Sequence, residues 1–172
     1  WIDPMLNIMD SNHTIAACQP KILDYNNRDY FEYAGASGGY IDILGYPFCR
    51  GRILNEIEKD EGQYNDIKDI FWATGACCII RREYFNEAGG FDEDFFAHQE
   101  EIDLCWRLQN LGYNIVVEPK SVVYHVGGGT LDYKSQFKTY LNFRNNLFML
   151  FKNLPLRHLI LIFPIRLFLD GL

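Results

Sequence analysis

Five consecutive residues carry the densest set of acid and base groups in the chain. The run Gln99-Glu100-Glu101-Ile102-Asp103 places three carboxylates at the start of a segment whose apolar residues have helical spacing. Acidic side chains in the first turn of a helix complement the helix dipole, which is a purely structural role. A carboxylate at the edge of a cleft also suits general-base catalysis, in which it accepts a proton from a nucleophilic hydroxyl. The residues alone leave both interpretations open.

A single histidine is the second candidate for chemistry. His125 ends a β-rich run and precedes the glycines at 127–129. A lone histidine is more often structural than a ligand, but a glycine-rich turn after a strand end is where α/β proteins place ligand contacts. The glycine run lacks G-x-G-x-x-G spacing and a following Walker lysine, which excludes a dinucleotide motif and a P-loop.

Hydrophobic periodicity predicts the elements that must position these residues. A helix directly followed by a short buried strand favours an α/β fold with parallel strands. After this strand, the segment 23–69 reads as a long loop, whose seven or so aromatic residues favour an ordered binding role. The predicted helices are 1–9, 82–88, 100–111, 134–152 and 156–169, and the predicted strands are 15–18, a central pair within 70–82, 114–117 and 121–125.

Length and charge restrict the class of protein. A chain of 172 residues has the size of one domain. The net charge of −7 argues against a nucleic-acid binder, which needs a basic surface. The charge is uneven, because 133–169 holds six Lys or Arg residues and no Asp or Glu. This basic, aromatic-rich end predicts contact with something anionic.

Cysteine usage favours a reducing compartment. The five cysteines lack C-x-x-C spacing and are odd in number, so we expect buried thiols, with Cys77 and Cys78 on opposite faces of a strand, and neither a disulfide framework nor a zinc site.

The chain opens on Trp1 inside an apolar helical pattern and ends shortly after an apolar run. We therefore expect further sequence on both sides.

Two segments together resemble a known family. The segments ATGACCIIRREYFNEAGGFDEDFFAHQEEIDLCWRLQNLGYNIVVEPKSVVYHVGGGTL and NFRNNLFMLFKNLP are similar to the C-terminal half of glycosyltransferase family 2, in particular its bacterial rhamnosyltransferase-like members. The likeness runs from Trp1 to about Pro155. It implies a partial nucleotide-diphospho-sugar transferase (GT-A-like) fold with a mixed sheet, flanking helices and a C-terminal helical extension. The expected division is an acceptor-side catalytic half at 1–132, without the nucleotide-binding half, and basic amphipathic helices at 133–172.

The resemblance implies an inverting transfer from a nucleotide-diphosphate sugar to a hydroxyl of a glycan or lipid-linked acceptor. The family's acidic pair falls on Glu100 and Glu101, and its usual base position is Glu101, here Glu instead of Asp. His125 matches a ligand of the divalent ion, Mg²⁺ or Mn²⁺, on the donor diphosphate. Family members line the acceptor pocket at Trp72, Thr74, Gly75, Ala76 and Asp92. Arg50 and Arg52 in the long loop are candidates for the diphosphate or an anionic acceptor, and a solvated basic turn is the other interpretation.

The last apolar run raises the question of membrane contact. Residues 156–169 are too few for the roughly 20 needed to span a bilayer. An interfacial helix with Arg157, His158 and Arg166 near anionic headgroups is one interpretation, and packing on another domain or a second copy is the other. The implied location is the cytoplasm, peripherally at the inner face of the bacterial plasma membrane.

Two other functions remain open at this point. A non-catalytic carbohydrate-binding or membrane-docking module would need neither a base nor a metal. A glycosidase would need two carboxylates about 5 to 9.5 Å apart across a cleft, which adjacent Glu100 and Glu101 do not favour. A fragment without the donor half is expected to be inactive alone.

Overall fold

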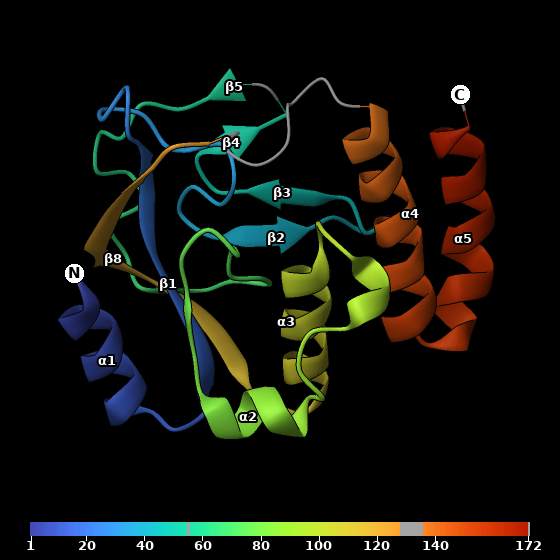
Figure 1. Ribbon diagram of the computed structural model, residues 1–172, viewed down its shortest axis with the longest axis horizontal. Coiled ribbons are helices and arrows are strands. Elements are labelled where there is room, and N and C mark those ends of the chain that lie inside the picture. The colour runs from blue at the N-terminus through green and yellow to red at the C-terminus, as the bar shows by residue number, and fades with distance from the viewer. Residues whose placement is uncertain (55, 128–135, 172) are drawn as a thin grey trace.

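The computed structural model describes residues 1–54, 56–127 and 136–171, and it shows a mixed α/β fold (Figure 1). The expected division between 132 and 133 falls outside the described residues. The helices are α1 (Ile2–Ser11), α2 (Arg82–Glu87), a 3₁₀ turn (Glu93–Phe95), α3 (Glu100–Asn110), α4 (Gln136–Asn153) and α5 (Leu156–Asp170). The strands are β1 (Ile15–Asp24), β2 (Gly39–Ile41), β3 (Pro47–Cys49), β4 (Arg52–Ile53), β5 (Glu56–Ile57), β6 (Lys68–Asp69), β7 (Ile79–Ile80) and β8 (Asn114–His125).

A mixed sheet in the order β6-β8-β1-β7 forms the centre of the fold. β1 and β8 pair in parallel, whereas β6 and β7 pair with them in the antiparallel direction. The predicted mixed sheet is therefore confirmed, and so are the helices that became α1, α2 and α3. Alternate residues of β8 separate two apolar clusters: Val116 packs with Met5 and Met9 of α1, and Ile115 and Val117 join the cluster that includes α3.

Strand β8 is one long strand where two were expected. Pro20 of β1 is paired with Glu118, and Lys21 with Val122, so the register shifts around Pro119. A proline cannot donate a hydrogen bond in a ladder and is tolerated at such a bulge. The strand therefore continues through Pro119 to His125, at the end of the parallel pair.

The segment 23–69 contains a second sheet and is not a plain loop. Strands β2 to β5 form an antiparallel sheet in chain order. Its strands have only two or three residues each, which is too short for a clear alternation of apolar and polar residues. The central strand pair expected within 70–82 is wrong, because only Ile79–Ile80 is a strand, and Cys77 and Cys78 precede it. All five cysteines are free.

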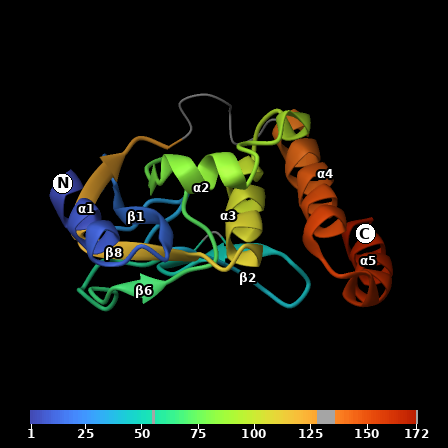
Figure 2. The same cartoon turned by 90° about the horizontal axis from the view of Figure 1, so that it is seen from below.

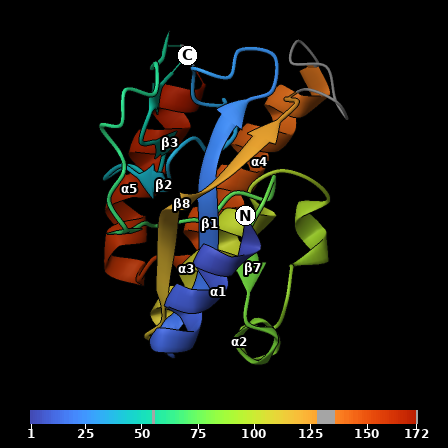
Figure 3. The same cartoon turned by 90° about the vertical axis from the view of Figure 1, so that its left-hand side faces the viewer.

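The last two helices lie side by side at the opposite end of the molecule from α1 (Figures 1 and 2). Seen from the side of α1, they stand behind the central sheet, beside the strands of the second sheet (Figure 3). α4 packs against α3 as well as against α5. The position of α4 therefore determines what covers the start of α3.

Candidate active site

A cavity of about 720 Å³ lies where the second sheet, the start of α3, α4 and α5 meet. This volume is typical of small-molecule sites. The second sheet and its loops contribute Tyr33, Phe48 and Arg52, and Trp72 contributes from the segment before β7. The remaining walls include His98, Gln99, Glu101 and Ile102 beside α3, Asn142, Phe143 and Asn146 of α4, and Arg166 of α5.

Glu101 is the carboxylate that the structure places on the cavity wall. A Cβ added at Gly75 would lie 3.9 Å from its Oε1, an ordinary van der Waals distance, so the carboxyl group lies directly beside Gly75. Its Oε2 is buried and has no hydrogen-bond partner among the described residues. Burial, followed by the charge of Glu100, raises the pKa of Glu101 to about 7. Interactions with the backbone N–H groups of Glu101, Gly75 and Gln99 partly offset the effect.

Glu100 precedes it on the helix but does not line the cavity. Its Oε2 is also buried without a partner among the described residues. Its charge acts on Glu101, where it favours the protonated form. The third acid of the run, Asp103, is fully buried and faces away into an ion-pair network with Arg107 and Lys152, at 2.8 and 2.9 Å.

Of the predicted acceptor residues, Trp72 lies on the cavity wall, whereas Thr74 and Ala76 lie in the turn behind it and are not among the lining residues. Trp72 lines the cavity and donates from Nε1 to the carbonyl of Tyr40 at 3.0 Å. A Cβ at Gly39 would lie 2.0 Å from the Trp72 ring, so the close approach of β2 requires glycine there. Thr74 is buried, and its hydroxyl donates to the carbonyl of Ala34 and accepts from the N–H of Ala76. Thr74 and Ala76 thus shape the turn that carries Gly75.

Asp92 lies elsewhere. It caps the 3₁₀ turn by accepting from the N–H of Asp94, and it pairs with Lys152 of α4 at 2.6 Å. Asp92 is not among the residues that line the cavity. These contacts give Asp92 a structural role, in which it fixes the loop before α3 to α4.

The two candidate arginines are separated. Arg50 pairs with Asp66 at 3.0 Å and lies over the ring of Tyr64, outside the cavity lining. Arg52 lines the cavity, where its guanidinium lies 4.1 Å from the centre of the Tyr33 ring. Among the residues with described positions, Arg52 has no carboxylate within ion-pair distance, and its buried Nε has no hydrogen-bond partner. Its Nη1 donates to the carbonyl of Leu54 at 2.9 Å, and Nη2 lies 3.8 Å from Sγ of Cys49. Arg52, which has no acidic partner among the described residues, is the candidate arginine that faces the cavity.

His125, the expected metal ligand, is not part of the cavity wall. Its Nδ1 lies 3.4 Å from Oε1 of buried Glu32, without hydrogen-bond geometry. Within the described ranges, no three His, Cys, Asp or Glu side chains come together in a way that would hold a metal ion. Mg²⁺ takes about six oxygen or nitrogen ligands in strict geometry, so the described residues do not form a complete metal site. Gly128 and Gly129 lie outside the described residues.

Sequence reasoning missed the part of the wall that α4 and α5 provide. Asn142 and Asn146 fall within the segment NFRNNLFMLFKNLP, whose polar residues interrupt an apolar helical pattern. A buried asparagine on such a helix signals a specific hydrogen-bond partner. Arg166 was expected near lipid headgroups, and this is wrong: it is fully buried, pairs with Asp170 at 3.0 Å and lies 3.6 Å from the centre of the Tyr46 ring.

Comparison with known proteins identifies the family. The sequence model described as "Glycosyl transferase family group 2" matches residues 3–169, so the chain belongs to this family. It is 33% identical over 88 residues to the N-acetylglucosaminyl-diphospho-decaprenol L-rhamnosyltransferase of Mycobacterium tuberculosis, over 51% of this chain and 28% of that protein. It is 32% identical over 78 residues to the rhamnosyltransferase WbbL of Escherichia coli, over 45% of this chain and 29% of that protein.

The fold has a counterpart among solved structures. The crystal structure of GalNAc-T7 with UDP, GalNAc and Mn²⁺ matches 87% of this chain and 28% of that chain, with a TM-score of 0.57 and 15% sequence identity. This likeness confirms the predicted GT-A-like fold class. The matched regions span less than a third of the length of each of these proteins.

Proposed function

We propose that this chain supplies the acceptor-binding surface and the general base of an inverting glycosyltransferase. The reaction moves a sugar from a nucleotide-diphosphate sugar to a hydroxyl of a glycan or lipid-linked acceptor in cell-surface polysaccharide synthesis. The single observation that carries the proposal is a carboxyl group, that of Glu101, on the wall of a cavity of about 720 Å³ with its pKa raised to about 7. Membership of the family supports the class of reaction.

The chemistry assigned to Glu101 is a proton transfer. Glu101 accepts the proton of the acceptor hydroxyl as that oxygen forms a bond to the anomeric carbon. The bond from this carbon to the diphosphate oxygen breaks on the opposite face, and the diphosphate leaves with the electron pair. A base with a pKa near 7 is suited to this step, because it is partly ionised at neutral pH and still binds a proton well.

The rest of the cavity suits a sugar with an anionic group nearby. Tyr33, Phe48 and Trp72 offer aromatic surfaces on which the apolar faces of sugar rings can pack. Arg52 offers a guanidinium that binds phosphate oxygens in a planar, two-pronged manner. We assign Arg52 to a phosphate of the donor or of a lipid-diphosphate acceptor, and Arg50, paired with Asp66, to the support of the loop.

The donor and the metal are taken from relatives. Two relatives are rhamnosyltransferases by name, which supports a deoxyhexose or hexose donor. The GalNAc-T7 structure contains UDP and Mn²⁺, which supports a nucleotide-sugar donor and a divalent ion, Mg²⁺ or Mn²⁺. His125 is the ligand that this chain would contribute, and its Nδ1 faces Oε1 of Glu32 at 3.4 Å, so Nε2 is the atom we assign to the ion.

We further propose peripheral membrane contact through α5, at the inner face of the bacterial plasma membrane. Leu161, Ile165 and Phe168 are spaced by four and three residues, so they share one helix face, and they are 66%, 48% and 68% exposed. Arg157 is exposed on the same helix and suits anionic headgroups. No helix of the described residues is both long and apolar enough to cross a membrane.

Paired substitutions test the base assignment. Glu101→Gln keeps the shape of the side chain but cannot accept the proton, so we expect sugar transfer by the intact protein to fall by a factor of at least about 100. Glu100→Gln is the matched control, and we expect it to keep most of the activity. Donors are screened as a panel of nucleotide-sugars with and without Mn²⁺. Retained transfer in Glu101→Gln, with loss in Glu100→Gln, would move the base to Glu100.

The second candidate function is a non-catalytic carbohydrate-binding or membrane-docking module. Of these two, the exposed apolar face of α5 favours a membrane-docking module. A protein that binds glycan or lipid but transfers no sugar from any donor of the panel would support this alternative over the transferase.

A further inference from the structure

The segment that leads into the first turn of α3 has an unusual backbone. Phe96, His98 and Gln99 all have positive φ angles, at 62°, 70° and 69°. Side chains other than glycine rarely adopt this conformation, and it persists only where surrounding contacts impose it. Gln99 is the N-cap of α3 but makes no capping hydrogen bond with its side chain. The position of Glu101, two residues later, therefore depends on what holds this segment.

Helix α4 supplies these contacts through buried amide groups. Asn145 is fully buried, and its Nδ2 lies 3.0, 2.7 and 2.7 Å from the carbonyl oxygens of Phe95, Ala97 and His98. An asparagine side chain has two N–H donors, so the three carbonyls that the strained segment turns inward share them. The carbonyl of Phe95 also accepts from the backbone N–H of Ala97 at 2.7 Å, whereas those of Ala97 and His98 accept from Asn145 of α4.

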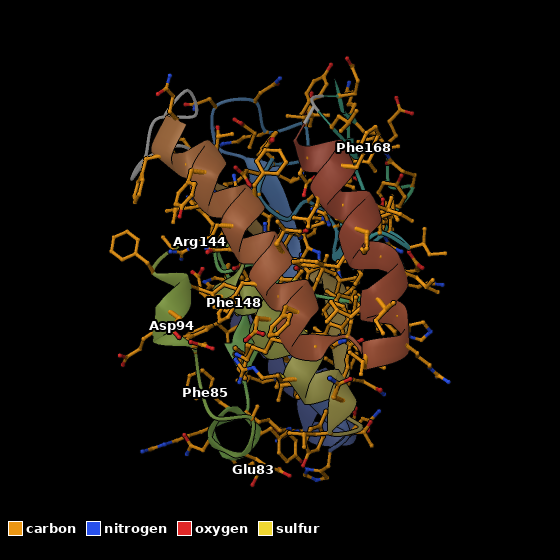
Figure 4. All side chains as sticks on the ribbon, turned by 90° about the vertical axis from the view of Figure 1, so that its right-hand side faces the viewer. Glu83, Phe85, Asp94, Arg144, Phe148 and Phe168 are labelled. Carbon is orange, nitrogen blue, oxygen red and sulfur yellow. The ribbon has the colours of Figure 1, made fainter. Side chains whose placement is uncertain are left out.

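Neighbouring residues of α4 extend the contact. Gln99 donates from Nε2 to the carbonyl of Asn142 at 2.9 Å, and its Oε1 accepts from Asn146 at 3.0 Å. Arg144 donates from Nη2 to the carbonyls of Asp94 and Phe95 at 2.8 and 3.0 Å. Figure 4 shows Arg144 on α4 facing the segment that carries Asp94, with Phe148 one turn further along. Both ends of the segment are thus fixed to one helix.

We propose that Asn145 is a positioning residue, which acts through the carbonyls of residues 95–98 to hold the carboxyl group of Glu101 at the cavity wall. The proposal rests on the proposed function only in that it takes Glu101 as the group to be positioned. Asn145 itself is not among the residues that line the cavity. Without its amide, the carbonyls of Ala97 and His98 lose their side-chain donor, and the segment relaxes from its left-handed conformation.

The expected consequence is a change at Glu101 that general destabilisation would not produce. Burial is the main cause that raises the pKa of Glu101. The charged or titratable groups near it are Glu100, the thiols of Cys49, Cys78 and Cys105, and the cavity residues Tyr33, Asp42, Tyr46, Arg52, His98 and Arg166. None of them belongs to α4, and Asn145→Ala removes no charge. A lower pKa in this variant therefore reports access of water to the carboxyl group.

The experiment is a carboxyl ¹³C NMR titration of this chain labelled on glutamate, with the Glu101 signal assigned by its loss in Glu101→Gln. In the unsubstituted chain we expect a midpoint near 7. In Asn145→Ala we expect a fall of at least about one unit toward the ordinary value of about 4.3. The matched control is Leu150→Ala, a buried residue of α4 that packs on Gly45, and we expect its Glu101 midpoint to stay unchanged.

A second variant covers the case in which Asn145→Ala does not fold. Arg144→Gln removes the two hydrogen bonds to Asp94 and Phe95 from a partly exposed position, and we expect a smaller fall in the same direction. A folded Asn145→Ala or Arg144→Gln with an unchanged Glu101 midpoint overturns the proposal, as does an equal fall in Leu150→Ala. These outcomes are independent of sugar transfer, so they are distinguishable from failure of the proposed function.

Discussion

At the scale of single residues, Glu101 combines a buried oxygen with a position on a cavity wall. Its Oε2 has no partner among the described residues. A buried carboxyl group without a compensating cation favours its neutral form. The group therefore has two properties that a general base needs, access to a site and a pKa near the working pH.

This raised pKa predicts a pH-dependent stability. The folded-state pKa of about 7 lies above the unfolded value, so the folded chain binds more protons between the two values. The free energy of unfolding should therefore fall as the pH rises from about 4.5 to 7. Glu101→Gln removes the group, so we expect it to be more stable than the unsubstituted chain at pH 8, on the order of 2 kcal/mol. Urea unfolding at pH 5 and pH 8 measures this difference, and an equal loss of stability with pH in both chains would contradict it.

The separation of the two arginines predicts unequal effects on binding. Arg52→Ala removes a cation on the cavity wall, so we expect the KM for donor or acceptor to rise by about tenfold or more. Arg50→Ala breaks a pair with Asp66 outside the cavity lining, and we expect a change in KM of less than about twofold. Steady-state kinetics on the intact protein compares them. A rise in KM of about tenfold or more in both variants would place both arginines at the diphosphate.

At the scale of elements, Asp103 connects α3 to α4. This fully buried carboxylate accepts from Arg107 and Lys152, at 2.8 and 2.9 Å, and from Asn153 at 2.7 Å. The pairing across two helices keeps α4 against the start of α3. Glu101 and Asp103 are two positions apart on α3, so their side chains point in different directions. Glu101 faces the cavity, and Asp103 holds α4.

We expect Asp103→Ala to destabilise the chain by about 2 to 3 kcal/mol, because it leaves Arg107 and Lys152 without their buried partner. The matched control is Asp29→Ala, which breaks an exposed pair with Lys59 and should cost less than about 0.5 kcal/mol. Urea unfolding at pH 7 measures both. A loss below about 1 kcal/mol in Asp103→Ala would show that the network does not hold the helices together.

The elements also show how far the sequence predicts this fold. Helices α1, α2 and α3 were predictable from local signals: the apolar spacing of α1 and α3, the polar break after α1 and the glycines that follow α2 and α3. The second sheet was not, because strands such as Arg52–Ile53 are held by turns and by packing of Gly39 on Trp72, which are contacts between distant residues. The family resemblance directed attention to Glu101, whereas the roles of Asn145 and Arg166 depend on partners more than 40 residues away.

At the scale of the whole molecule, α5 has the reverse of the usual distribution of side chains. Its fully buried residue is Arg166, and its exposed side carries large apolar residues such as Leu161 and Phe168. Figure 4 shows this helix beside α4, with Phe168 near one end. Exposed apolar side chains that gather on one helix mark a contact surface.

We expect this face to bind vesicles that contain phosphatidylglycerol. The double variant Leu161→Glu with Phe168→Glu places two acids on the face, and we expect it to abolish flotation with such vesicles. The matched control is Ile43→Glu, at an apolar position that is 87% exposed but lies outside α5. Absence of flotation by the unsubstituted chain, or equal flotation by the double variant, would contradict membrane contact through α5.

The most direct test of the central claim is the pH dependence of sugar transfer by the intact protein in single-turnover conditions. Because Glu101 must be ionised to accept the proton, we expect the rate to rise about tenfold per pH unit below pH 6 and to level off above about pH 7. In Glu101→Gln the residual rate should lose this inflection, whereas Glu100→Gln should keep one, shifted to lower pH by removal of the neighbouring charge. A rate independent of pH between 5 and 8, or an inflection retained in Glu101→Gln, would contradict the assignment of Glu101 as the base.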